Sequence, residues 1–222
     1  MNDSFTLPTT AAAQDLSVLL GRAARLDDAG AVRLIADSGV LAMYVAVITP
    51  KGLLDRSPTV LGLRTTALLE GSFDAVVPVA SLQARLDAAL TSSSDGPVTV
   101  RVPTAVHTVI WAAITPPRGG WQRMTALEPT PLTAAARAGI EEVAAAIPEN
   151  TGEQIVHRVR SEVWGRPVEG HDHLPAGVAF AGEALGFFGD DPVQQFAAGP
   201  WIRLSTQRGH ILVKQGAWSL GG

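Results

Sequence analysis

The spacing of apolar residues predicts strands in the first half of the chain. Val98–Val102 alternates apolar and polar side chains, which is typical of a half-buried strand. Two apolar segments flank Asp37-Ser38-Gly39, a sequence that favours the tight turn of a β-hairpin. We expect further strands over Thr59–Leu69, Phe73–Val79 and Ala105–Ile114, and helices over Asp15–Asp28 and Ser81–Leu90.

Helical spacing dominates the second half. Thr130-Pro131 is typical of a helix start, and apolar residues then recur at helical intervals as far as Ile147. A second helix is expected over Thr151–Trp164, and a third, rich in glycine and apolar residues, over Leu174–Phe188. The acidic residues agree, since one of the ten before residue 105 is glutamate, against eight of the eleven after it. Glutamate favours helix interiors, whereas aspartate favours turns and caps.

Proline and glycine mark the boundary between the halves. Pro116-Pro117-Arg118-Gly119-Gly120-Trp121 interrupts regular structure, because adjacent prolines end it and adjacent glycines permit a reversal. Near the end of the chain, Trp201–Thr206 and His210–Lys214 flank a turn with glycine and predict a β-hairpin. We therefore expect an α+β protein. A β-rich region with one or two helices covers residues 1–115, and a helical region that ends in the hairpin covers residues 116–222, as two domains or packed into one.

Composition favours a globular cytoplasmic protein. The chain has 222 residues, of which 46% are hydrophobic and 17% charged, so a sizeable core can form. It contains no cysteine, which excludes disulfides, thiolate metal ligands and cysteine nucleophiles. The N-terminus lacks the features of a secretory signal, and the longest apolar run, Val40–Ile48, is too short to cross a membrane. We expect no membrane partner.

The charge pattern does not favour nucleic acid as a partner, although the order of elements keeps DNA binding as an alternative. The net charge is −4 and the sequence contains no basic run. Three helices followed by a hairpin that bears Arg203 and Arg208 is the order of a winged-helix DNA-binding domain. Against this, the expected helix over Leu174–Phe188 has no Arg, Lys, Gln or Asn to contact DNA, so the preceding helix, with Arg158, Arg160 and Arg166, would have to take its place.

Two histidines form the one candidate metal site. His171 and His173 are two residues apart, so an extended backbone would place both imidazoles on the same side. Such a pair can begin a zinc or nickel site, which still needs a third protein ligand. The other interpretation is a polar loop between two helices. We expect no cofactor, and a metal-dependent enzyme that uses zinc or nickel at this pair is a further alternative.

The sequence favours a non-catalytic protein that associates with itself or with another protein. It contains no Gly-x-Ser-x-Gly elbow, no Walker loop and no Gly-x-Gly-x-x-Gly motif, although single catalytic residues on separate elements stay compatible with it. Tryptophan and arginine are frequent interface anchors, which directs attention to the boundary segment, the hairpin and Trp218 near the end of the chain. The candidate binding residues are Arg118, Trp121, Trp201, Arg203 and Arg208. The alternative role for the tryptophans is in the core.

The chain also carries two resemblances. Pro116–Trp121, Val163–Pro167 and Arg203–His210 resemble a family of proteins from actinobacteria, the high-GC Gram-positive bacteria. That resemblance covers most of the chain and implies no activity, because none is assigned to the family. The first half is similar, in the order of its elements alone, to one subdomain of a bacterial sliding clamp. That order is a helix, paired strands, a strand that ends in Val76–Val79, a second helix and then Val98–Val102.

Overall fold

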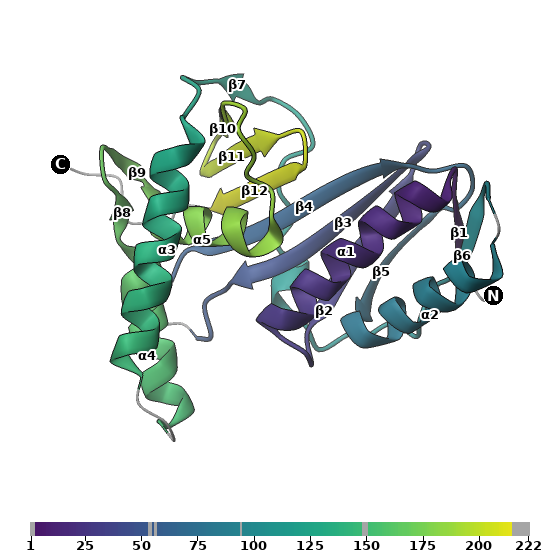
Figure 1. The fold of residues 1–222 in the computed structure, drawn as a ribbon, viewed down its shortest axis with the longest axis horizontal. Helices are drawn as coiled ribbons and strands as arrows, with labels where there is room; N and C mark the ends of the chain where they lie inside the picture. The colour runs from purple at the N-terminus through teal and green to yellow at the C-terminus, as the bar shows by residue number, and fades with distance from the viewer. Residues whose placement is uncertain (1–2, 53–54, 56, 94, 148–150, 215–222) are drawn as a thin grey trace. The chain divides into compact units, whose positions relative to one another are not determined.

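The computed structural model describes residues 3–52, 55, 57–93, 95–147 and 151–214, and it confirms the α+β class (Figure 1). The chain forms two compact units. The first contains Met1–Ala46 and Leu63–Thr115, and the second contains Val47–Gly62 and Pro116–Gly222. The second unit thus includes a segment of the first half, because the ends of two long strands belong to it.

A sheet with the strand order β5-β2-β3-β4 supports the first unit. These strands are β2 (Ala31–Asp37), β3 (Val40–Ile48), β4 (Thr59–Ala67) and β5 (Phe73–Pro78). β2 and β3 form the expected hairpin, in which Ser38 and Gly39 have φ angles of 51° and 77°. This left-handed pair makes the tight turn that matches the twist of the two strands.

Two helices lie side by side on one face of these strands, α1 (Thr10–Leu26) and α2 (Val79–Ser92) (Figure 1). The hydroxyl of Thr9 caps α1 by accepting the Ala12 N–H at 3.1 Å. The helix therefore begins before the expected Asp15, because its alanine-rich first turn has high helix propensity without an apolar stripe. The buried face of α1 comprises Ala13, Leu16, Leu19, Leu20 and Ala23.

A separate ribbon pairs β1 (Ser4–Leu7) with β6 (Val98–Arg101) in antiparallel order. β1 is not among the expected strands, since its four residues are too few to show a clear alternation. The prediction of a strand over Ala105–Ile114 is wrong. That segment is irregular apart from one 3-10 turn, η1 (Ile110–Ala113), and His107 within it is exposed rather than buried in a strand.

Three helices and the C-terminal strands build the second unit. The helices are α3 (Pro129–Ala146), α4 (Glu153–Gly165) and α5 (Ala176–Leu185). The strand order is β4-β12-β11-β10-β7, with β7 (Gln122–Arg123), β10 (Gln194–Ala198), β11 (Trp201–Thr206) and β12 (Gly209–Lys214). A small hairpin of β8 (Pro167–Val168) and β9 (His171–Pro175) precedes α5. Among the described residues, no helix has both the length and the apolar character that crossing a membrane requires.

The C-terminal hairpin has the register expected from its sequence, but it is not a wing. Ile202 pairs with Val213 and Leu204 with Ile211, so these side chains share one face and Arg203 lies on the other. β12 has β4 as its other neighbour and β11 has β10, so the hairpin is an inner part of a sheet. α5 is largely buried and is not free to enter a DNA groove. The winged-helix interpretation of the second half is therefore wrong.

Glycine residues allow the three helices of the second unit to pack closely against one another. Gly139 of α3 faces the indole of Trp164 on α4, and a Cβ atom at Gly139 would lie 2.3 Å from that ring. Trp164 also stacks on Phe180 of α5, with ring centroids 4.4 Å apart. One indole thus contacts both other helices. Within α5, Gly182 faces the Phe188 ring, where a Cβ atom would lie 2.2 Å from the ring.

Replacing Gly139 by alanine should lower the melting temperature. The added methyl group would overlap the Trp164 indole, which Phe180 holds in place, and overpacking of this kind costs about 1–3 kcal/mol. Gly21→Ala in α1 is the matched control, because nothing lies within 4 Å of the added Cβ atom. Alanine there should be neutral or stabilising. Thermal unfolding followed by circular dichroism compares the proteins, and a Gly139→Ala variant as stable as wild type would contradict this packing.

Candidate functional site

Arg203 lies within a group of aromatic side chains on the sheet of the second unit. Its guanidinium carbon is 4.6 Å from the centre of the Trp121 ring and 4.5 Å from the centre of the Phe196 ring. At these distances the faces of both rings attract the cation. Together with His210, whose pKa the charge of Arg203 affects, these residues are called the Arg203 cluster: Trp121, Phe196, Arg203 and His210.

The strand register brings three members of the Arg203 cluster together. Phe196 of β10 is the direct partner of Arg203 on β11, so the two side chains lie on the same face of the sheet. Ser205 follows Arg203 by two residues and therefore shares its face, and Ser205 pairs with His210 of β12. A hydrogen bond of 2.9 Å between Ser205 Oγ and His210 Nδ1 holds the imidazole in place.

Trp121 reaches the cluster from the proline- and glycine-rich boundary segment. Gly120 precedes it with a φ of 75°, a left-handed conformation that residues with a side chain rarely adopt. The indole N–H of Trp121 donates a hydrogen bond to the carbonyl oxygen of Pro117 at 3.1 Å. The boundary segment therefore does more than connect the halves, because its local turn holds the indole against Arg203.

The charge of Arg203 has no counter-charge in the described part of the chain. Its Nε atom is buried without a hydrogen-bond partner, and the cause that lowers the pKa of Arg203 is burial, with no carboxylate contributing. Burial also lowers the pKa of His210, and the positive charge of Arg203 lowers it further. A flat guanidinium fixed between two rings suits bidentate binding of a carboxylate or phosphate.

The remaining candidate binding residues have other positions. Arg208 donates from Nη1 to the carbonyl oxygen of Phe188 at 2.9 Å, just beyond α5. Trp201 is only 5% exposed and belongs to the core, and Arg118 is exposed in the boundary segment. Trp218 lies outside the described residues. Of the five candidates, the structure thus brings Trp121 and Arg203 into contact, and their role in binding stays a prediction.

His171 and His173 lie on β9 rather than in a loop. Their rings meet edge to face with centroids 6.2 Å apart, as expected for an extended segment. Nε2 of His173 is hydrogen-bonded to the side-chain amide of buried Gln195, at 2.6 Å. No group of three or more His, Asp or Glu side chains gathers as metal ligands among the residues that the structure describes. Zinc or nickel binding at this pair stays a prediction from the sequence.

A second polar group fastens the segment before β4 to helix α4. Oδ2 of Asp55 is 2.7 Å from Nε2 of His157, and the carboxylate accepts the backbone N–H groups of Lys51 and Ser57, both at 2.8 Å. Burial alone would raise the pKa of Asp55, but hydrogen bonds from Ser57, Lys51 and His157 outweigh it. They hold the pKa of this carboxyl well below its usual range. Helical spacing alone indicates Glu153, four residues earlier on α4, as the neighbour of His157. Spacing cannot reveal Asp55, because it lies about 100 residues away along the chain.

Asp55→Asn should destabilise the protein near neutral pH by about 1–3 kcal/mol, because a carboxylate that accepts several hydrogen bonds is lost. The depressed pKa means that this contribution is present above the ordinary carboxyl pKa of about 3.9. This contribution to stability disappears as the pH falls through the pKa that Asp55 has in the folded protein. The difference in melting temperature from wild type should therefore shrink as the pH is lowered below about 4.

Asp190→Asn is the control for this pH series, because Asp190 is exposed. It should melt like wild type at every pH. A difference between Asp55→Asn and wild type that stayed constant down to the acid limit of folding would contradict the role of the ionised Asp55 carboxylate.

Bacterial sliding clamps are among the solved structures that share this arrangement of elements. DNA polymerase III subunit beta from Borrelia burgdorferi aligns with a TM-score of 0.54 and 8% identity over 97% of this chain and 65% of its own. Pol III beta from Caulobacter crescentus aligns with a TM-score of 0.51 and 13% identity over 98% and 66%. The sliding clamp from Bartonella birtlesii gives 0.50 and 13% over 99% and 66%. This chain therefore spans just under two thirds of the length of these clamps, and the fold it shares with them is clamp-like.

The chain belongs to the family described as Domain of unknown function (DUF8010), which matches residues 1–113. Residues 116–218 match a second family, described as Domain of unknown function (DUF8185). No curated protein matches the chain. The two family matches meet at the proline- and glycine-rich segment that supplies Trp121 to the Arg203 cluster.

Proposed function

We propose that this protein is non-catalytic and acts by associating with another protein, and that the Arg203 cluster receives an acidic group of that partner. The observation that carries the proposal is the guanidinium of Arg203, which lies over two aromatic rings without a carboxylate of the described chain beside it. Cationic side chains that are partly buried for structural reasons are normally paired with an anionic group. An unpaired arginine at such a position is suited to a counter-charge supplied from outside.

The composition of the cluster supports this role. Tryptophan and arginine are enriched among the residues that dominate the binding energy of protein interfaces. The two rings restrict the guanidinium before a partner arrives, so less side-chain entropy is lost on binding. Arg123 pairs with Phe196 in register and so adds a second guanidinium on this face, hydrogen-bonded to Gln194. A partner carboxylate would therefore meet donors from more than one strand.

The clamp-like fold supports association in a more general way. The structures from Borrelia burgdorferi and Caulobacter crescentus are named as the beta subunit of DNA polymerase III, a protein that works as part of an assembly. We infer that this chain also works within an assembly, as a cytoplasmic protein. Its partner is either a second copy or a different protein that presents a carboxylate.

Association is tested by size-exclusion chromatography with light scattering over a range of concentrations, followed by chemical crosslinking in cell extract. We expect wild type to form a complex with itself or with a defined protein, and Arg203→Met to lose that complex. A wild-type protein that stays a strict monomer, and that crosslinks to the same proteins as Arg203→Met, would overturn the proposal.

Arg203→Met should leave the melting temperature unchanged or raise it, because it removes a partly buried charge that the described chain does not compensate. Arg33→Met is the matched control. The guanidinium of Arg33 bonds Asp74 at 2.7 and 2.9 Å and the carbonyl oxygen of Ala112 at 2.8 Å, so its loss should cost about 1–3 kcal/mol. Should Arg203→Met lose as much stability as Arg33→Met, Arg203 would be a structural residue and the proposal would fail.

DNA binding is the second candidate, and the similarity of the fold to DNA polymerase clamps is the observation in its favour. The net charge of −4 is unfavourable for it. A gel-shift assay with duplex DNA at low and high salt decides the question. Retardation that weakens as salt rises would support DNA binding, and free migration at low salt would exclude it.

A further inference from the structure

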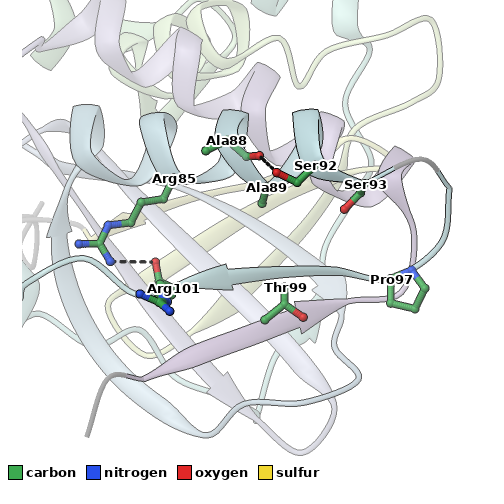
Figure 2. A pocket seen from close by; sticks show the side chains of 8 residues that line it. All are labelled: Arg85, Ala88, Ala89, Ser92, Ser93, Pro97, Thr99 and Arg101. Atoms are coloured by element: carbon green, nitrogen blue, oxygen red, sulfur yellow. Dashed lines mark hydrogen bonds between the residues drawn. The ribbon is translucent and has the colours of Figure 1, made fainter.

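An open groove in the first unit lies between α2 and the side of β6 that faces away from β1 (Figure 2). Its volume is about 640 Å³. Helix α2 forms one wall and the edge of β6 forms the other. The side chains that matter are Arg85, Ala88, Ala89 and Ser92 from α2 and Thr99 and Arg101 from β6. None of them is a candidate from the sequence.

The backbone of β6 directs hydrogen-bonding groups into this groove. Thr6 is the register partner of Thr99, but its own N–H and C=O bond Glu70 and Leu69 on the far side of β1, both at 2.9 Å. Antiparallel partners that do not bond each other point their backbone groups away from the pair. The N–H and C=O of Thr99 therefore face the groove, and so do those of Arg101, two residues further on.

No strand in the described part of the chain covers this side of β6, because β1 and β6 form a sheet of two strands. A side chain reaches it at one end: Nη1 of Arg85 lies 3.5 Å from the carbonyl oxygen of Arg101 (Figure 2). The same atom lies 3.0 Å from the carbonyl oxygen of Val102. An uncovered edge of this kind is a template for a further strand.

The chemistry of the groove indicates the charge of its occupant. Arg85 and Arg101 are exposed, and no aspartate or glutamate is among the residues that line the groove. Ala88 and Ala89 present small side chains from α2, so there is room beside the helix for the side chains of an added strand. An acidic segment therefore complements the groove in both charge and shape.

We propose that this groove binds an extended, acidic segment of a partner protein by strand addition to β6. The added strand exchanges backbone hydrogen bonds with Thr99 and Arg101, and its carboxylates meet the guanidinium groups of Arg101 and Arg85. The site lies on a different unit from the Arg203 cluster and rests on separate observations. Strand addition takes its affinity from the main chain and its specificity from alternate side chains.

The register of the side chains defines the pattern of the segment. Val98 and Val100 are buried, whereas Thr99 and Arg101 lie on the other face of the ribbon, are exposed and line the groove. Side chains of the added strand alternate in the same way. Those on the face of Val98 and Val100 are small or apolar, and those on the face of Thr99 and Arg101 are carboxylates.

The test uses a fluorescein-labelled peptide of alternating valine and glutamate, about six residues long, with the complete protein and fluorescence anisotropy. We expect saturable binding, and loss of binding when lysine replaces each glutamate. Two further peptides carry N-methyl groups on alternate residues. Strand addition requires that only one of the two loses affinity, because one set of peptide N–H groups faces β6 and the other faces solvent.

Variants of the protein identify where the peptide binds. Arg101→Glu should weaken binding about tenfold or more, and Ala89→Trp should weaken it by filling the groove. Arg158→Glu, the same change of charge at an exposed position of α4, should bind like wild type. Arg203→Met should also bind like wild type, which separates this site from the Arg203 cluster. Melting curves confirm that each variant is folded.

Three results would overturn the proposal: no binding of the valine–glutamate peptide, equal binding of the two N-methylated peptides, or equal loss of affinity in Arg101→Glu and Arg158→Glu. The second result would mean that charge alone attracts the peptide. A loss confined to Arg203→Met would place the peptide at the other unit.

Discussion

The fold of the second unit depends on how closely α5 approaches its neighbours. This helix is apolar on almost every side, so shape rather than polar contacts must fix its position. Glycine supplies the shape: a Cβ atom at Gly62 of β4 would lie 2.1 Å from the Leu185 side chain. β12 packs against α5 with its buried side chains, including Ile211 and Val213. The opposite face of the same sheet carries Arg203, so the position of its guanidinium depends on this packing.

The sequence alone predicts the helices and strands that have strong local signals. It does not predict those whose conformation depends on pairing with distant parts of the chain. The hairpins around Gly39 and Gly209, the three helices of the second half and the α+β class follow from apolar spacing, turn residues and caps. β1 and β10 were missed, because a strand of four or five residues gains its stability from pairing and shows little periodicity of its own. Ala105–Ile114 shows the reverse error, since it contains β-branched residues yet forms no strand, although the Val106 N–H bonds the carbonyl oxygen of Val76 on β5 at 2.8 Å.

The candidate site shows the same limit. Trp121 and Arg203 were selected for their residue types, but their contact depends on a turn at Gly120 and on a β10 strand that supplies Phe196. Arg33 and Arg203 look alike in the sequence, yet one is surrounded by acceptors and the other by rings. Only the fold distinguishes an arginine that holds two segments together from one that has no carboxylate of the described chain beside it.

The uncovered edge of β6 also has a consequence for the protein when it is concentrated. Two copies that met through this edge would bring the guanidinium groups of Arg101 and Arg85 toward those of the second copy, and like charges across paired strands oppose pairing. A strand of four residues offers few backbone hydrogen bonds to offset that repulsion. Cations on a short edge thus oppose pairing of two copies through this part of the backbone. High ionic strength would weaken this effect, because it screens exposed charges.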